Sequence, residues 1–299
     1  MNQQAAKAFI VRHARPVDLA VYRYFFEQGD RAQVVEALNQ FRNGDGGFGH
    51  GLEMDFLNPA SSPIATNDAI ITLHRVGALQ AESEVVRGMV RYLQSGDAFD
   101  GARKRWLFAV DSNRDYPHAI WWEKEGDGIS GFNPTMSLAA FLVCFGGRTP
   151  LAEEILREGL AYLEEQADMG SDALKCYLLA CELLEENGVT DVIDLERLRS
   201  LISLRISRNV CRDTGLYGKA YVPLPSDLFA GTYLSFLTEE MLPLARAEKA
   251  VLGDLQLEDG GFDITWTWQT DYPEEFRRAR DGWRPRLTLD KLLFDMAVR

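Results

Sequence analysis

Apolar residues recur along most of the chain at intervals of three and four, the spacing that places them on one face of an α-helix. Val34, Val35, Leu38 and Phe41 form one such set, and strand-like alternation is scarce. The pattern predicts an all-α chain of about twelve helices, at roughly 5–13, 17–28, 34–41, 69–76, 85–93, 135–146, 150–163, 172–187, 193–209, 226–238, 242–256 and 287–298.

The connections between these helices alternate between short and long. The long connections are 43–64, 96–134, 210–225 and 257–286, and each leads from an odd-numbered helix to an even-numbered one. If successive helices alternate in direction, all four long loops emerge at the same end. The pattern predicts one domain, residues 1–299, whose helix pairs close into an α/α toroid, an (α/α)6-type barrel with any active site on one rim. A helical solenoid is the alternative, and the lack of polar capping repeats favours the ring.

Composition and charge indicate which classes of partner the chain is expected to bind. Apolar residues make up 46% of the 299 and charged residues 26%, which is typical of a folded chain. The net charge of −13 repels phosphate backbones, so a nucleic-acid partner is not expected. No stretch approaches the roughly 20 apolar residues of a membrane span, and the first residues lack a secretory signal, so no integral membrane association is expected. Four scattered cysteines without a CxxC pair indicate a reduced, cytoplasmic compartment without a structural zinc module.

One short motif occurs twice. Gln40–Phe48 reads QFRNGDGGF, and residues 256–262 read QLEDGGF. In both copies a predicted helix ends before an Asp-Gly-Gly-Phe sequence. Paired glycines accept left-handed dihedral angles, Asp caps a turn with its side chain, and the Gln amide is expected to tie helix ends together. The motif therefore predicts a repeated helix stop between stacked helix pairs, with residues 211–217 as a degenerate third copy.

This repeat resembles the Gln-Trp-type repeat of the terpenoid cyclase and protein prenyltransferase toroid superfamily, most closely where the second copy continues to Trp266. The resemblance covers two motif copies and, in architecture, most of the chain. It implies an α/α toroid with an apolar or isoprenoid-type substrate in its centre. The chain lacks the Asp-x-Asp-Asp acid motif and the Asp-Asp-x-x-Asp metal motif of terpenoid enzymes. No histidine follows Cys211 to complete a prenyltransferase zinc site, so zinc is not expected.

The first candidate for catalysis is the loop that follows the first motif copy, with His50, Glu53 and Asp55. Glu53 and Asp55 are two residues apart, so in an extended segment their carboxylates point the same way. Such a pair can share a proton at a raised pKa or bind a divalent cation, and His50 could relay protons. Alternatively, Asp55 braces the next helix.

The second candidate is the aromatic segment that follows Tyr116. His118 with Glu123 or Asp127 could form an acid–base pair. Aromatic faces stabilise carbocations and stack on sugars, so the candidate substrate-binding residues here are Trp121, Trp122, Phe132 and Asn133. Core packing of the tryptophans is the alternative.

Two further groups complete the candidates. Arg103, Lys104 and Arg105 form a candidate anion site, with Asp111 and Asp115 as candidate Mg²⁺ ligands. A solvated surface run is the alternative. The loop 257–286 is a candidate lid over the substrate, and it carries the aromatic residues Trp266, Trp268 and Tyr272. Plain packing of these aromatic side chains is the alternative.

Together these features predict an enzyme of the lyase, isomerase or transferase type with a small-molecule substrate of isoprenoid character. Protonation or Mg²⁺-assisted ionisation by the Glu53, Asp55 or His118 region would start the reaction. Two alternatives stay open: a carbohydrate-active (α/α)6 glycosidase or lyase, and a non-catalytic binding module. The residue pattern leaves the oligomeric state open.

Overall fold

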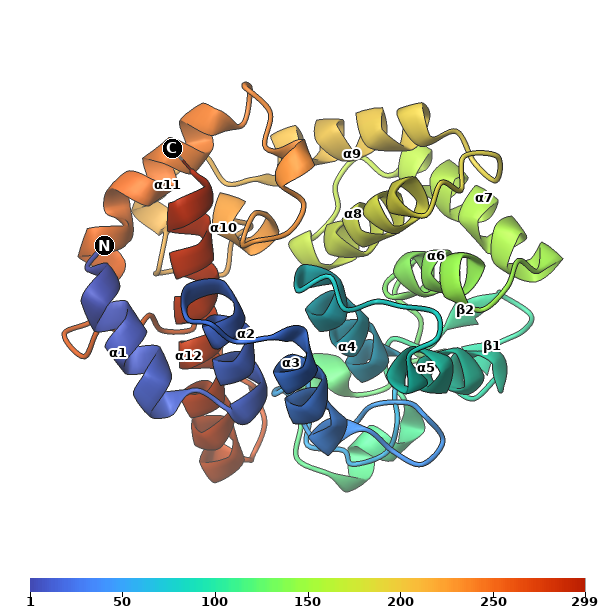
Figure 1. Cartoon of the computed structure of the whole chain (residues 1–299), viewed down its shortest axis with the longest axis horizontal. Coiled ribbons are helices and arrows are strands. Elements are labelled where there is room, and N and C mark those ends of the chain that lie inside the picture. Colours follow the sequence, from blue (N-terminus) through green and yellow to red (C-terminus); the bar gives the residue numbers. More distant parts are fainter. Residues whose placement is uncertain (299) are drawn as a thin grey trace. The chain divides into compact units, whose positions relative to one another are not determined.

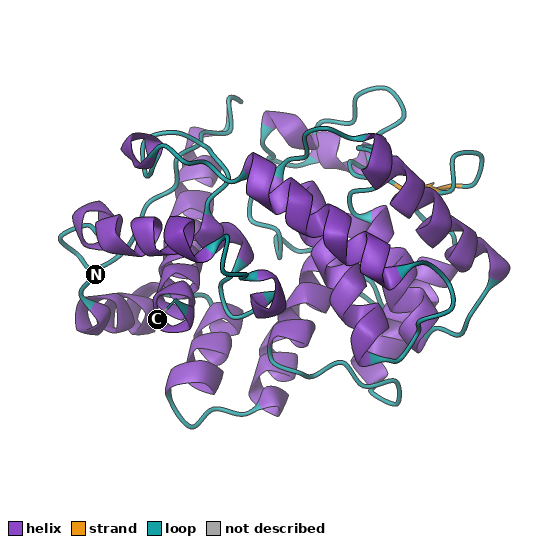
Figure 2. Cartoon of the chain, turned by 90° about the horizontal axis from the view of Figure 1, so that it is seen from above, coloured by secondary structure: helices purple, strands orange, loops and turns teal. Residues whose placement is uncertain are grey.

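The computed structural model describes residues 1–298, in which α-helices α1–α12 are joined by loops and short 3-10 helices (Figure 1). The strands β1 (Phe99–Asp100) and β2 (Arg105–Trp106) form one antiparallel hairpin, and the rest of the described chain is helix and loop (Figure 2). The all-α prediction is confirmed. None of the described helices combines the length and the apolar character needed to cross a bilayer.

The chain divides into two compact units. Unit 2 is Leu38–Arg208, and unit 1 combines Met1–Ala37 with the described part of Asn209–Arg299. Unit 1 is therefore built from both ends of the described chain.

Unit 2 is centred on helix α6. Its elements are η1 (Asn39–Phe41), α4 (Pro63–Arg75), α5 (Glu84–Gln94), β1, β2, η2 (Asp111–Asp115), η3 (Ile120–Trp122), α6 (Thr135–Phe145), α7 (Pro150–Glu165), α8 (Ser171–Glu186) and most of α9 (Leu195–Asn209). Residues 135–143 of α6 are all buried, as expected for a helix that is apolar on every side. Helix α6 packs against α4, α5, α7 and α8 (Figure 1).

Unit 1 is centred on the long helix α12. Its elements are α1 (Gln3–His13), α2 (Pro16–Phe26), most of α3 (Arg31–Leu38), η4 (Thr214–Leu216), α10 (Pro225–Leu228), η5 (Leu234–Phe236), α11 (Leu242–Leu255) and α12 (Pro273–Ala297). Helix α12 packs against α1, α2 and α10 (Figure 1). Gln3 of α1 donates a hydrogen bond to Asp295 of α12 at 2.7 Å, which links the two ends of the described chain.

The first copy of the Asp-Gly-Gly-Phe motif is a tight turn in unit 2. Asp45 Oδ1 accepts the backbone N–H of Gly47 at 2.8 Å, and the Phe48 N–H donates to Thr66 Oγ1 at 3.1 Å. Gly46 has a φ of +97° and lies so close to α5 that a Cβ atom would be 2.2 Å from a backbone oxygen. The turn therefore requires glycine for its dihedral angle and for its contact with the helix.

The second copy repeats this geometry in unit 1. Asp259 Oδ1 accepts the Gly261 N–H at 3.0 Å, and the Phe262 N–H donates to Thr288 Oγ1 at 3.0 Å. Gly260 has a φ of +93°, and a Cβ there would be 2.4 Å from a backbone oxygen of α1. The predicted repeat is thus the same turn in both units.

The glutamines of the two copies are not equivalent. Gln256 ties helix ends together as predicted, because its amide exchanges two hydrogen bonds, at 2.7 and 3.0 Å, with the Asn2 backbone. Gln40 lies two residues further from its Asp-Gly-Gly than Gln256 does. Arg42 occupies the position of Gln256 in the first copy and pairs with Glu84 at 3.2 Å.

Two predicted elements are wrong. The sequence predicts one helix over 226–238, but helix α10 ends at Leu228. Gly231 and Tyr233 have left-handed φ angles of +80° and +57°, so the helix does not continue through them. The predicted lid loop 257–286 is half helix, because α12 begins at Pro273. The first half of helix α12 lacks apolar periodicity. Charged pairs at helical spacing stabilise it instead, such as Arg277–Asp281 at 3.4 Å.

Candidate functional site

Buried polar side chains gather at the amino-terminal ends of helices α4 and α6. Thr66 and Asn67 are buried in the first turns of α4, and Thr135 and Ser137 are buried at the start of α6. Ser137 donates a hydrogen bond to Asn67 Oδ1 at 2.6 Å, which joins the two helices. Burying polar groups costs free energy unless they are paired, so their concentration at these helix ends marks a candidate functional site.

Helix α8 contributes to the same network from its own first turns. Cys176 is buried and its thiol donates to Asn133 Oδ1 at 3.3 Å, just before α6 begins. Burial raises the pKa of Cys176 to about 12, so this thiol stays protonated and acts as a weak hydrogen-bond donor. The amino-terminal ends of α4, α6 and α8 therefore share one polar network.

Glu53 lies among three other carboxylates at this end of unit 2. Burial raises the pKa of Glu53 well above its usual range, and the negative charges of Asp68, Asp55 and Asp172 raise it further. The Asp55 N–H donates a hydrogen bond to Glu53 Oε1 at 3.0 Å, which by itself lowers the pKa of Glu53. Burial and the like charges have the larger effect, so the pKa is raised in total. Glu53 therefore keeps its proton at pH values where an ordinary glutamate has lost it.

One neighbouring carboxylate differs from Glu53 in its surroundings. Asp172 lies in the first turn of α8, where the helix dipole favours its ionised form, and Lys175 pairs with it at 3.1 Å. The cluster thus combines a carboxyl group of raised pKa with a carboxylate whose surroundings favour its ionised form, the combination that general acid–base chemistry requires.

Two of the predicted catalytic loops meet beside this cluster. The Asp55 carbonyl accepts the Ala119 N–H at 2.8 Å, and the Leu57 N–H donates to the Pro117 carbonyl at 2.9 Å. The structure thereby brings His118 next to the Glu53 loop, with a backbone bridge between Phe56 and His118.

A buried asparagine holds these loops together. Asn58 is fully buried, and its side-chain amide donates to Ser112 Oγ at 2.8 Å and to Asn113 Oδ1 at 2.9 Å. The Asn113 amide in turn donates to the Trp122 carbonyl at 3.0 Å. Because each group in this chain of amides is satisfied by the next, the two loops form one rigid layer.

His118 has a defined tautomer in the structure. Its Nδ1 lies 2.6 Å from the Tyr116 carbonyl oxygen, which can only accept, so Nδ1 carries a proton. Its Nε2 faces Glu123 Oε1 at 3.9 Å. The predicted pair of His118 and Glu123 is thus brought close together. Asp127 instead pairs with Arg103 at 3.1 Å and does not take part.

The predicted aromatic residues of unit 2 divide into core and surface. Trp122 is buried, with its ring 4.6 Å from Phe108 and 5.0 Å from Phe56 between centroids. Trp121 is only partly buried. Phe132 is buried under the Arg105 guanidinium, 3.5 Å from its ring centroid. The packing interpretation fits Trp122 and Phe132, whereas part of the Trp121 side chain stays exposed.

Other candidates in unit 2 are engaged in local contacts. Exposed His50 lies with Nε2 2.8 Å from Asn43 Oδ1, within the first motif turn. Asp111 pairs with Lys124 at 2.7 Å, so a cation there would have to displace the lysine. Asp115 is exposed.

The predicted anion site is already neutralised by carboxylates. Arg103 pairs with Asp100 at 2.8 Å, and Lys104 pairs with Glu154 and Glu158 at 2.8 and 2.7 Å. Arg105 also pairs with Glu158, at 3.1 Å. These ion pairs attach the β1–β2 hairpin to α7, which favours the structural interpretation of the basic triplet.

The remaining aromatic candidates belong to unit 1. Trp268 is buried in its core, and Tyr272 immediately precedes α12. The Trp266 ring packs edge-to-face against Trp283 at 5.4 Å and Tyr221 at 5.7 Å. Packing accounts for Trp268 in particular.

Neither Asp68 nor Asp172 stands out in the sequence, because Asp68 directly precedes the predicted helix 69–76 and Asp172 begins the predicted helix 172–187, where an acidic residue is common. One signal could have found Asp68. The sequence Pro-x-x-Thr-x-Asp occurs at residues 63–68 and again at 285–290, and each Thr caps one motif turn.

Comparison with known proteins adds no relative: no protein-family model matches the chain, and neither a curated protein nor a solved structure is significantly similar to it.

Proposed function

We propose that this chain is an α/α toroid enzyme in which Glu53 is a general acid, and that its substrate is a carbohydrate. The observation that carries the proposal is the raised pKa of Glu53 among Asp55, Asp68 and Asp172. A carboxyl group of raised pKa beside a carboxylate whose surroundings favour its ionised form is the arrangement that cleaves glycosidic bonds.

The reaction needs two proton transfers. Glu53 donates its proton to the glycosidic oxygen while the bond from that oxygen to the anomeric carbon breaks, so the leaving sugar departs as a neutral alcohol. A water molecule adds its oxygen to the anomeric carbon and gives a proton to the carboxylate of Asp172, whose ionised form Lys175 and the start of α8 favour. Both groups regain their initial states by exchanging protons with solvent. The side chains of Asn67, Asn133 and Ser137 are buried and hydrogen-bonded at the same helix ends, and this network holds the surroundings of the cluster in place.

An isoprenoid substrate is the second candidate, and the Asp-Gly-Gly-Phe repeats support it through their resemblance to terpenoid cyclases and prenyltransferases. Two observations favour the carbohydrate. Protonating a carbon–carbon double bond calls for a strong acid, whereas burial and like charges weaken the acidity of Glu53. The three basic residues 103–105 that could hold a diphosphate are paired with carboxylates.

A substrate panel with one variant tests the proposal. The protein is incubated with aryl glycosides, polysaccharides and prenyl diphosphates with Mg²⁺, and Glu53→Gln is compared with Glu165→Gln, a control at the exposed end of α7. We expect turnover of a glycoside, with kcat lowered by about a hundredfold or more in Glu53→Gln and unchanged in the control. Turnover of prenyl diphosphates alone would favour the second candidate. Equal activity of Glu53→Gln and the wild type would overturn the assignment of the acid.

A further inference from the structure

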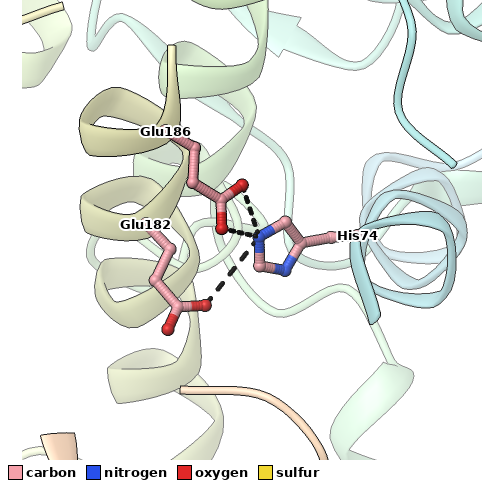
Figure 3. A group of neighbouring side chains, drawn as sticks. All are labelled: His74, Glu182 and Glu186. Atoms are coloured by element: carbon pink, nitrogen blue, oxygen red, sulfur yellow. Dashed lines mark hydrogen bonds and ion pairs between the residues drawn. The ribbon is translucent and has the colours of Figure 1, made fainter. Parts of the chain in front are cut away.

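A separate group of titratable side chains lies at the carboxyl-terminal ends of α4 and α8. His74 is in the last turn of α4, and Glu182 and Glu186 are in the last turns of α8. Because the two glutamates are four residues apart, they lie on the same face of the helix. Figure 3 shows both carboxylates pointing toward the His74 ring from one helix to the other.

The donor atoms are spaced as the ligands of one small ion. His74 Nε2 lies 3.2 Å from Glu186 Oε2 and 3.8 Å from Glu182 Oε2. One ligand atom from each of the three side chains lies within 4.8 Å of the other two. Ligands at about 2.1 Å from a tetrahedral ion are about 3.4 Å from each other. Small rotations of the glutamate side chains would therefore complete the coordination.

The charges of the group favour a cation. A protonated His74 balances only one of the two carboxylates, so the group carries a net negative charge in either state of the imidazole. Arg199 hydrogen-bonds to Glu185 at 2.6 and 3.0 Å, and the negative charge of Glu182 also raises the pKa of Arg199. Both helices end here, and the partial negative charge of helix carboxyl termini attracts cations.

The three side chains of the group differ in their exposure to solvent. The side chains of His74 and Glu182 are 9% and 13% exposed, whereas that of Glu186 is 59% exposed. Two ligands are thus held by the surrounding structure, and the third is at the surface, where an ion can enter and a water ligand can remain.

We propose that His74, Glu182 and Glu186 bind a divalent transition-metal ion, and that this ion is zinc. Imidazole nitrogen and carboxylate oxygen are zinc ligands, and three protein ligands with a water molecule complete a tetrahedral site. Mg²⁺ fits less well, since it prefers six oxygen ligands and keeps its water. This site is independent of the Glu53 cluster and of the function proposed for it.

Metal titration of the full chain tests the site. Protein stripped with a chelator is titrated with Zn²⁺ by calorimetry and with Co²⁺ by visible absorption, which reports tetrahedral coordination. We expect one ion per chain. Each of His74→Gln, Glu182→Gln and Glu186→Gln should weaken binding at least about tenfold. The controls His50→Gln and Glu165→Gln, both at exposed positions, should bind as the wild type does.

Three results would overturn the proposal: no saturable zinc binding by the wild type, binding that survives in all three ligand variants, or tighter binding of Mg²⁺ than of zinc. Circular dichroism of each variant before titration shows whether it is folded. If His74→Gln does not fold, Glu186→Gln decides the question, because that side chain is mostly exposed. Glu53→Gln should bind zinc normally, which separates this result from the test of the proposed function.

Discussion

Alanine at Gly46 or Gly260 should destabilise the protein strongly, and for the same two reasons in each unit. The φ angles of +97° and +93° disfavour any residue with a Cβ, at a cost of about 1–3 kcal/mol. The added Cβ atoms would also lie 2.2 and 2.4 Å from backbone oxygens, against about 3.3 Å for the closest ordinary contact between carbon and oxygen. Each turn would have to withdraw by about 1 Å from the helix it touches. We expect a total loss of about 3–4 kcal/mol for either variant.

Urea unfolding followed by circular dichroism and tryptophan fluorescence measures this loss. Gly44→Ala is the matched control, because a Cβ there meets no atom within 4 Å and its φ is outside the left-handed region. The control should be neutral or gain about 0.4–1 kcal/mol. Because Gly46 and Gly260 belong to different units, each variant should mainly lower the midpoint of its own unit if the units unfold separately. A change below about 0.5 kcal/mol in either variant would refute the reasoning from turn geometry.

Three further predictions follow from buried groups. Since the pKa of Glu53 is raised on folding, the wild type should lose stability as pH rises through that pKa. Glu53→Gln has no carboxyl group to titrate there, so it should not show this loss. If urea unfolding gives a difference in stability between the wild type and Glu53→Gln that does not change with pH, the raised pKa of Glu53 is contradicted. Glu248 is fully buried 2.8 Å from Lys291, and Lys291→Met should cost about 3–5 kcal/mol by leaving that charge unpaired. Adding Glu248→Leu should restore part of this loss, whereas strictly additive losses in a double-mutant cycle would exclude the coupling. Burial raises the pKa of Cys176 to about 12, so a thiol reagent should label the partly exposed Cys211 in the folded protein and reach Cys176 only in urea. Equal labelling rates would contradict the buried placement.

The helices could be predicted where burial alone determines the pattern. Helix α6 is mostly apolar and spans Thr135–Phe145, one residue shorter than the predicted range 135–146. The first half of α12 was missed, because charged side chains at helical spacing support it in place of an apolar face. Helix α10 was predicted too long, because the left-handed angle at Tyr233 depends on its surroundings and leaves no apolar signal.

The candidate site could be predicted only where its members are close in sequence. Glu53 and Asp55 stand two residues apart, so their spacing pointed to a shared proton. Asp172 reaches the cluster because α8 packs on α6, a contact that periodicity does not specify. The same limit applies to His74 and Glu186, which are 112 residues apart and meet only through the packing of unit 2.

The discontinuous make-up of unit 1 bears on how the chain folds during synthesis. Helix α1 emerges from the ribosome before the other described helices, but its packing partner α12 is made more than two hundred residues later. Unit 2 can fold as soon as its own residues have emerged, whereas Phe9 and Ile10, which are buried in unit 1, must wait for their partners. During that interval α1 and α2 expose apolar surface on the nascent chain, and chaperones that recognise such surface would have their longest access there.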